Sequence, residues 1–260
     1  MIMRVYLDFM MVNLKSQMQY KISFLLTVIG QFMTAYTSWF GLYFVMQRAG
    51  GIDGFTKGQV TICFAVVMLS FAIGEMFGGG FAVFARILGN GEFDRIMSRP
   101  GNILLQVLVP HMDFTRIGLL LQAVLVLGLV MPSCGIFWTG RKILLLCLMV
   151  LSGSAVFFGL FLLQASFSFF TMENLQFLDI FTYGSRSFGR YPFSIYGETV
   201  LKFLTFVIPL ACFQYYPLLY LTERETNILY ALSPVMALVF LLPCFGFFYF
   251  GVHKFKSTGS

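Results

Sequence analysis

The side chains that could carry out chemistry are few in this sequence and lie far apart. Ser152 and Ser154 stand in an apolar run that contains no histidine to act as their base. The two histidines, His111 and His253, form no HExxH zinc motif. The five cysteines are scattered and mostly lie within apolar runs, so we expect buried thiols rather than disulfides or metal ligands. These patterns disfavour a serine hydrolase and a metalloenzyme.

Nucleotide-binding motifs are also incomplete. Residues 51–57 lack the Gly-Lys-Ser/Thr ending of a phosphate-binding loop. Residues 89–91 begin like a dinucleotide fingerprint but lack its third glycine. We therefore expect no catalytic residue, no metal and no cofactor bound by this chain. Energy for any active transport would then come from an ion gradient or from another subunit. Carriers driven by an ion gradient usually bury ionisable groups near the middle of the membrane, and the centres of these apolar runs hold none, so another subunit is favoured.

One acidic residue, Glu75, stands at the end of an apolar run. Acidic residues inside a membrane are functional candidates because a charge at the bilayer centre costs about 2.5–3.5 kcal/mol. A helix advances about 26 Å from Gly58 to Glu75 at about 1.5 Å per residue, which places this carboxylate near a membrane boundary. It is therefore either an ordinary solvated group or a candidate gating carboxylate. The flanking Gly74 and Gly78 form a small-xxx-small pair that would let another helix approach closely.

The composition indicates which elements position these residues. Of the 260 residues, 58% are hydrophobic and 11% are charged, whereas a soluble domain carries about 25% charged residues. The mean hydropathy is +0.84. The continuous apolar runs are too long for the strands of a membrane barrel, so the sequence predicts an all-α integral membrane protein. Six transmembrane helices are predicted within a single domain, 1–260, at approximately 22–46, 59–81, 117–134, 143–168, 203–221 and 227–251.

The basic residues predict the orientation of these spans. Six spans put both termini on one side, and most of the 17 lysine and arginine residues then lie on that side. The positive-inside rule therefore predicts cytoplasmic termini. The same bias explains the net charge of +6, so the charge gives no reason to expect nucleic-acid binding. The run that begins at Ile22 has no clear cleavage site and is expected to remain as a span.

Residues 1–21 predict an amphipathic helix that lies at the membrane interface. Its polar and apolar side chains separate onto two faces of a helix. The polar face carries Arg4, Asp8, Lys15 and Gln19, and the apolar face carries Met3, Leu7, Met10, Leu14 and Met18. The alternative is a cytoplasmic extension of the first span.

A short charged helix is predicted between the second and third spans. Gly-Asn-Gly at 89–91 and Pro-Gly at 100–101 would break the helix on either side of residues 92–99. One face of this helix is charged and the other is apolar: Glu92, Arg95 and Arg99 on the first, and Phe93, Ile96 and Met97 on the second. Such a helix suits docking to a cytoplasmic partner, and an ordinary interfacial helix is the alternative.

The fifth predicted span contains Pro209 and Pro217. Two prolines at this spacing cannot both lie in an undisturbed helix. We expect a span that is broken near its outer end and continues as a re-entrant segment, which is tolerated where protein covers the irregular backbone. Residues 173–202, which precede it, are predicted to form an interfacial connector.

This order of elements resembles the membrane subunits of type-2 ABC exporters over essentially the whole chain. The most specific part is the string GEFDRIMSRP at 91–100, although Phe93 stands where a leucine is expected. Tyr191-Pro192, Tyr196, Pro209 and Tyr216-Pro217 add to the resemblance. Within this group the chain is similar to bacterial permeases of about its own length that are often encoded in pairs beside one ATPase.

The resemblance implies a role for each of these regions. The ATPase-coupling helix would consist of Glu92, Phe93, Asp94, Arg95, Ile96 and Arg99, and the gate or helix break would consist of Pro209, Tyr216 and Pro217. Two ABC ATPase subunits would bind ATP and Mg²⁺, and a second permease, identical or homologous, would complete the transport path across the bacterial plasma membrane. The expected function is ATP-driven export by alternating access, with an amphipathic or lipid-like molecule as the candidate substrate. An ATP-independent secondary carrier or channel is the alternative.

Overall fold

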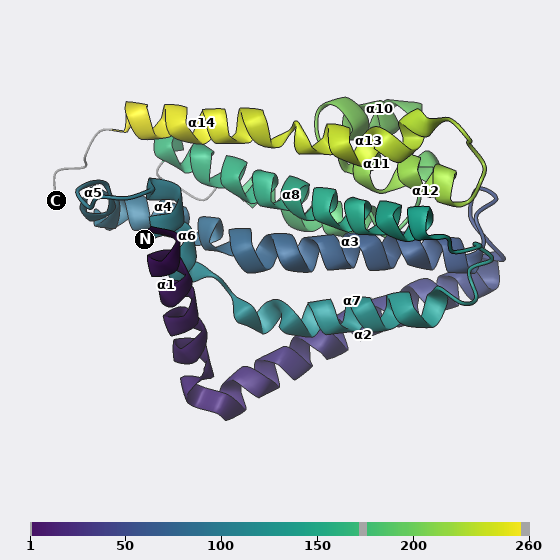
Figure 1. Ribbon diagram of the computed structural model, residues 1–260, viewed down its shortest axis with the longest axis horizontal. Coiled ribbons are helices and arrows are strands. Elements are labelled where there is room, and N and C mark those ends of the chain that lie inside the picture. The colour runs from purple at the N-terminus through teal and green to yellow at the C-terminus, as the bar shows by residue number, and fades with distance from the viewer. Residues whose placement is uncertain (1, 172–175, 256–260) are drawn as a thin grey trace.

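The computed structural model describes residues 2–171 and 176–255, and the named secondary-structure elements in these ranges are all helical. The long helices run side by side, and α1 (Ile2–Gln17) lies across one end of them (Figure 1). The long helices are α2 (Lys21–Ala49), α3 (Lys57–Gly78), α7 (Ile117–Val130), α8 (Gly140–Thr171), α13 (Ile228–Leu238) and α14 (Leu241–Lys254). The shorter α-helices are α4 (Phe84–Gly89), α5 (Glu92–Met97), α6 (Ile103–Leu108), α9 (Ser185–Phe188), α10 (Glu198–Phe206), α11 (Leu210–Phe213) and α12 (Tyr215–Leu221).

The described part of the chain has three helical stretches that are long and apolar enough to cross a membrane. They are Lys57–Gly89, Gly140–Thr171 and Ile228–Lys254. Two bent pairs raise the number to five if each pair is one span: Ile103–His111 with Phe114–Val130, bent by 60°, and Glu198–Phe206 with Leu210–Leu221, bent by 86°. The helix α2, predicted as the first span, is not among the five. It has 29 residues, but polar side chains such as Gln31 and Thr34 interrupt its apolar surface.

Helix α3 lies at the centre of the fold and packs tightly on α8. A Cβ atom added at Gly74 would lie 2.7 Å from Cβ of Phe157, and one added at Gly78 would lie 3.2 Å from the ring of Phe158. The close approach predicted for the two glycines is therefore confirmed, with α8 as the partner helix. The Ser70 hydroxyl donates a hydrogen bond of 3.2 Å to the Val150 carbonyl across the same interface, so this apolar contact also contains a polar link.

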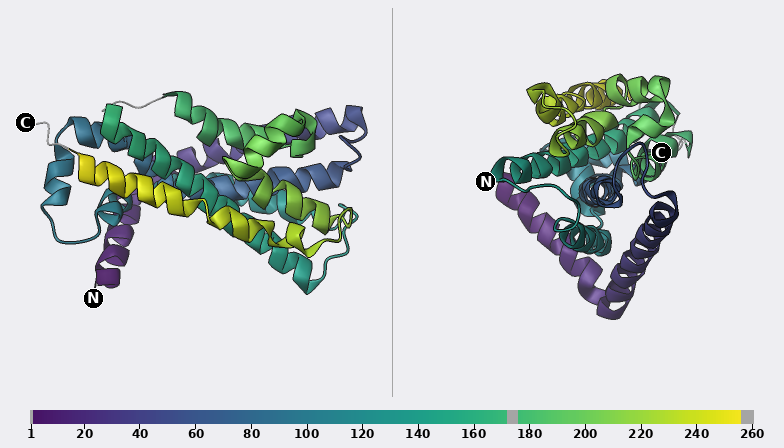
Figure 2. Two further views of the ribbon diagram at one scale, coloured as in Figure 1. Left: turned by 90° about the horizontal axis from the view of Figure 1, so that it is seen from above. Right: turned by 90° about the vertical axis from the view of Figure 1, so that its right-hand side faces the viewer.

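The segment between α8 and α10 differs from its prediction as an interfacial connector. Three contacts place it along α3 and antiparallel to it: Tyr183 on Phe71, Arg186 on Met68 and Gly189 on Val67. The part that runs along α3 includes the π-helix η6 (Ile180–Gly184) and α9, and Figure 2 (left) shows it running lengthwise beside the other helices. Charged residues made this stretch look interfacial, but packing against α3 and α8 covers much of it. Glu173, in the same predicted connector, lies outside the described residues.

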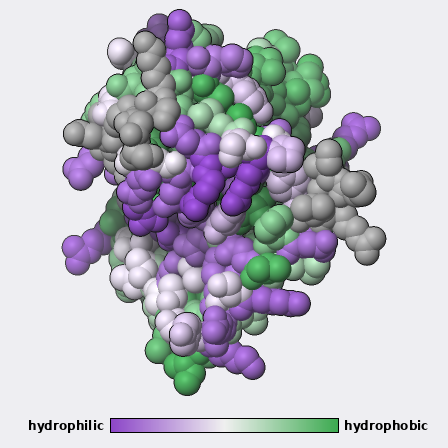
Figure 3. Space-filling view, turned by 90° about the vertical axis from the view of Figure 1, so that its left-hand side faces the viewer, coloured by the Kyte–Doolittle hydropathy of each residue, from purple (hydrophilic) through white to green (hydrophobic). Residues whose placement is uncertain are grey.

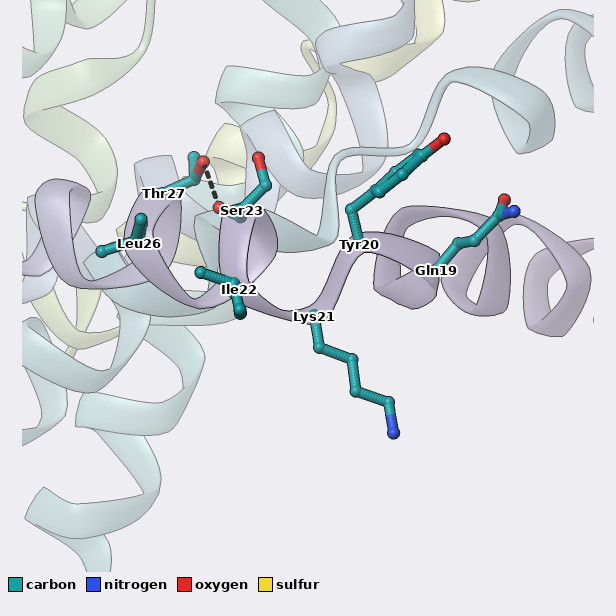
Figure 4. A pocket seen from close by; sticks show the side chains of 7 residues that line it. All are labelled: Gln19, Tyr20, Lys21, Ile22, Ser23, Leu26 and Thr27. Atoms are coloured by element: carbon teal, nitrogen blue, oxygen red, sulfur yellow. Dashed lines mark hydrogen bonds between the residues drawn. The ribbon is translucent and has the colours of Figure 1, made fainter.

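The chain turns sharply at Tyr20, between α1 and α2, where φ is −98° and ψ is 75°. Figure 4 shows the open hollow at this corner, lined by residues 19–23, 26 and 27, with Tyr20 and Lys21 pointing to opposite sides. All of its lining comes from one short stretch of chain, so the hollow is the inside of a bend at the surface. The corner separates the crossing helix α1 from the long helix α2, as expected for an interfacial segment that leads into a span.

The apolar face predicted for α1 is only partly correct. Met10 and Leu14 pack against Met76, Val109, Met112 and Phe114, as an apolar face should. Leu7 and Met18, however, are exposed by 53% and 44%, and the side chain of Met3 lies outside the described residues. The difference arises because part of the apolar surface of α1 contacts the bundle and part faces outward, where lipid would cover it.

Gly118 offers a test of how α2 and α7 pack. A Cβ atom at this position would overlap the carbonyl oxygen of Val28, whereas one at Gly128, in the same helix, would meet nothing within 4 Å. We expect Gly118→Ala to destabilise the protein by about 1–3 kcal/mol through overpacking. Gly128→Ala should be neutral or stabilising, because alanine favours a helix by about 0.5–1 kcal/mol over glycine. Thermal unfolding of the purified variants in detergent measures both, and equal melting temperatures would contradict this packing.

Candidate functional site

The predicted docking helix is present as α5, at the end of the bundle where α1 begins. It starts after Gly91, whose φ of 69° is the left-handed conformation that glycine tolerates best. Figure 3 views this end of the molecule and shows a hydrophilic surface across its middle. The exposed polar residues of α4–α6 and their loops are Arg86, Asn90, Arg95, Ser98, Arg99 and Asn102. Two arginines of the predicted charged face, Arg95 and Arg99, are thus open to a partner, while Glu92 and Asp94 are half-buried.

The opposite face of α5 is held by a group of phenylalanine rings that we call the aromatic anchor. It consists of Phe84, Phe93, Phe169, Phe248 and Phe255. Phe93 is fully buried, and its ring meets those of Phe84, Phe169 and Phe255 edge to face at 5.0–5.4 Å. Edge-to-face pairs are favourable beyond the area they bury. The ring at position 93, where the resemblance leads one to expect leucine, therefore attaches α5 to the ends of α8 and α14.

Glu75 belongs to a buried ionic cluster near the same end of α3. Its side chain is 2% exposed, and a carboxylate oxygen lies 3.3 Å from Arg116. Arg116 also pairs with Asp113 at 3.1 Å. The interpretation of Glu75 as a solvated boundary carboxylate is therefore wrong, because the packing of α3 buries it and Arg116 supplies the opposite charge. The gating role stays a prediction.

Two amide side chains of α1, Asn13 and Gln17, form what we call the amide clamp. Asn13 donates hydrogen bonds to the carbonyls of Val109 and Met112 at 3.0 and 3.1 Å. Gln17 also donates to the Met112 carbonyl and accepts from the backbone N–H of Phe114 at 3.0 Å. These backbone groups lie at the 60° bend between the two parts of a candidate span. The clamp thus satisfies polar groups that the bend takes out of the helical hydrogen-bond pattern.

The amide clamp and the ionic cluster meet on the same turn. Asp113 follows directly after Met112, and its N–H donates to the carbonyl of Met76, one residue beyond Glu75. Thr115 donates to Asp113 at 2.6 Å and accepts from Gln31 of α2 at 3.0 Å. Helices α1, α2, α3 and α7 are therefore joined at one polar junction beside the end that carries α5.

The predicted gate residues lie at the opposite end of the bundle, on α11, α12 and the bend before them (Figure 1). Pro209 precedes α11 at the 86° bend, and Pro217 is buried in α12. The Tyr216 hydroxyl lies 3.0 Å from that of Thr205, across the bend. The structure thus shows the predicted break at Pro209, and it separates these residues from both α5 and Glu75.

Two further polar side chains attach the segment after the bend to its neighbours, and sequence reasoning missed them. Gln214 is fully buried and donates to the carbonyls of Gly189 and Tyr191 at 3.3 and 3.2 Å. Ser233, on α13, donates to the carbonyl of Cys212 at 2.8 Å. An isolated amide within an apolar run is the signal that could have identified Gln214, and the amides of the clamp lie similarly among apolar residues of α1.

The structure and the sequence comparisons together define the class of this protein. Among the described residues, no group of three or more His, Cys, Asp or Glu side chains could hold a metal ion. The chain is a helical membrane protein with a short charged helix exposed at one end and a bent helix pair at the other. The family model described as ABC-2 family transporter protein matches residues 32–259. The chain therefore belongs to the ABC-2 family, whose membrane subunits are in general non-catalytic. No curated protein and no solved structure gives a significant match.

The amide clamp can be tested by removing one amide. Gln17→Leu should leave the N–H of Phe114 without its partner, at a cost of about 1–3 kcal/mol for such a group, while the Met112 carbonyl keeps the hydrogen bond from Asn13. We expect a lower melting temperature and faster hydrogen exchange at the Phe114 amide. Lys15→Leu is the matched control, because Lys15 is exposed on the same helix. Unchanged exchange at Phe114 in the Gln17 variant would show that the clamp does not hold the bend.

The aromatic anchor predicts a graded response at position 93. Phe93→Ala should destabilise the protein by about 3–5 kcal/mol, the range for a fully buried phenylalanine. Phe93→Leu should cost less because it leaves a smaller cavity. Met97→Ala, on the same helix but 37% exposed, serves as the control. Chemical unfolding in detergent measures all three, and similar values for Phe93→Ala and Met97→Ala would exclude the anchor.

Proposed function

We propose that this chain is the transmembrane permease subunit of an ATP-driven exporter, and that a separate ABC ATPase docks on α5. The observation that carries the proposal is the construction of α5. Its buried ring, Phe93, ties it to the aromatic anchor, and its exposed arginines, Arg95 and Arg99, face outward. A helix that only rested at the interface would need no such attachment. Membership in the ABC-2 family supports the ATPase as the partner.

In this proposal the chain crosses the membrane six times, with both termini and α5 in the cytoplasm of a bacterial cell. Helix α2 supplies the first crossing, since its 29 residues extend about 44 Å. The fifth crossing begins along α3, at residues 176–196, rather than at residue 203. Helices α10–α12 then form the re-entrant gate with Pro209, Tyr216 and Pro217, and α13 with α14 returns to the cytoplasm. The positive-inside rule supports this orientation.

The proposed mechanism is alternating access. ATP binding and Mg²⁺-dependent hydrolysis occur on two ATPase subunits, whose closure would displace α5. Because Phe93 contacts Phe169 and Phe255, the ends of α8 and α14 would move with α5. The pair of Glu75 and Arg116, which joins α3 to the turn before α7, is the proposed gating contact. A second permease, identical or homologous, would complete the wall of the transport path. For ATP to drive the change between the inward-open and outward-open states, the contacts between subunits must differ in the two states.

Copurification of the ATPase tests this proposal. We would purify the tagged protein from native membranes in mild detergent and assay the eluate for ATPase activity. The ATPase activity that copurifies should be at least about tenfold lower for the double variant Arg95→Glu, Arg99→Glu. Reversing a charge that closely contacts an opposite charge on the partner costs over about 1.4 kcal/mol of binding free energy, which corresponds to a tenfold loss of affinity. Arg141→Glu, which changes an exposed residue in the first turn of α8, should retain this activity.

The outcomes separate the exporter from its alternative. Loss in the double variant, with an unchanged melting temperature, supports docking on α5. If no ATPase copurifies with the wild type in several detergents, the ATP-independent carrier or channel becomes the better interpretation. If the double variant retains its ATPase, docking takes place elsewhere.

A further inference from the structure

Two arginines, Arg186 and Arg190, lie beside α3 at the depth of its middle turns. The guanidinium of Arg186 lies 4.9 Å from the ring centre of Phe71, and its Nε is 3.4 Å from the sulfur of Met68. Both contact residues belong to a stretch long and apolar enough to cross a membrane. Charged residues at such depth are expensive and as a rule face a protein interior or a water-filled path. Their cost calls for a compensating partner.

The described part of the chain provides no ion pair for either arginine. No carboxylate oxygen there lies within 4 Å of Arg186 or Arg190. The Glu75 carboxylate, on the same helix as the contact residues of Arg186, is paired with Arg116. The Nε of Arg190 is buried without a hydrogen-bond partner. Arg186 and Arg190 carry like charges and stand four residues apart on the same segment, so an anion bound between them would stabilise the pair.

The surroundings of the two arginines combine polar and apolar exposed groups. Both arginine residues are half-buried. Tyr183, Ser187 and Phe188, on the same segment, are exposed beside them. Arg186 lies in α9, and Arg190 lies in the turn two residues after the end of that helix. The segment therefore offers two forked cationic donors and an exposed aromatic ring, Phe188, while the Ser187 hydroxyl already donates to the carbonyl of Tyr183.

We propose that Arg186 and Arg190 bind the anionic group of an amphipathic substrate, a phosphate or carboxylate that carries an apolar tail. The guanidinium fork matches the oxygen geometry of these groups and binds them in bidentate fashion. Phe188 and the neighbouring apolar surface contact the tail. The inference rests on the proposed transport function and adds the chemical class of its substrate.

Direct binding to the purified permease tests this site without the ATPase. The probes are radiolabelled dodecyl phosphate, dodecyltrimethylammonium and inorganic phosphate, with binding measured by scintillation proximity in uncharged detergent. The variants are Arg186→Gln, Arg190→Gln and the double variant that carries both changes. Arg48→Gln removes an exposed positive charge elsewhere and is the matched control. Gel filtration and melting temperature show whether each variant is folded.

We expect wild-type protein to bind dodecyl phosphate at least about tenfold more tightly than either other probe. Each single variant should weaken this binding about tenfold, and the control should not change it. If a glutamine variant is misfolded, Arg186→Lys and Arg190→Lys replace it; these keep the charge but lose the fork, and should weaken binding by a smaller factor.

Four results would overturn the assignment. The first is that wild type and the folded double variant bind dodecyl phosphate equally well. The second and third are that wild type binds the cationic probe, or inorganic phosphate, as tightly as dodecyl phosphate. The fourth is that wild type binds no probe and forms a permease dimer that dissociates in the glutamine variants. The last would show that a partner subunit's carboxylate occupies the arginines. Because no ATPase is present, these results are independent of ATPase copurification, which tests the proposed function itself.

Discussion

The structure depends on one constraint, that backbone polar groups within a membrane must find partners inside the protein. Straight helices satisfy it by themselves, but the described part of this chain contains two bent candidate spans and a segment of short helical turns before α10. Amide side chains supply partners at two places: Asn13 and Gln17 near Met112, and Gln214 at Gly189 and Tyr191. The bends are therefore specific points of attachment between helices. Without these amides, unpaired carbonyls would destabilise each bend by an amount comparable to a lost hydrogen bond.

The same constraint explains how distant parts of the fold are connected. The polar junction joins α1, α2, α3 and α7, while the aromatic anchor joins α5 to α8 and α14. Central α3 contacts both α7 and α8. Two kinds of attachment, one polar and one aromatic, thus lie at the end that carries α5. A displacement of α5 would reach α8 and α14 through ring contacts, whereas the turn before α7 is tied to α1 by hydrogen bonds and to α3 by an ion pair.

The sequence predicted the helical membrane fold, a short helix at 92–99 that the structure ends at Met97, the close approach of Gly74 and the break at Pro209. These features depend on composition or on local breakers such as glycine and proline, which act over a few residues. The environment of Glu75, the course of residues 179–194 and the amide clamp depend on contacts between residues far apart in the chain. Charge alone suggested an interface for Arg186, because the sequence does not show that α3 lies beside it. Likewise, the amphipathic pattern of α1 could not distinguish surface that faces lipid from surface that faces the bundle.

The course of residues 179–194 has a consequence for biosynthesis. A translocon inserts a segment into the bilayer according to its own hydrophobicity, and an arginine near the centre opposes insertion by about 2.5–3.5 kcal/mol. This stretch carries two arginines and is divided among short π, α and 3₁₀ turns, so it offers a weak insertion signal. Its place beside α3 must come from helices already in the membrane, with Phe71, Met68 and Val67 as its receiving surface. The order of synthesis suits this requirement, since α3 and α8 leave the ribosome before the segment that depends on them.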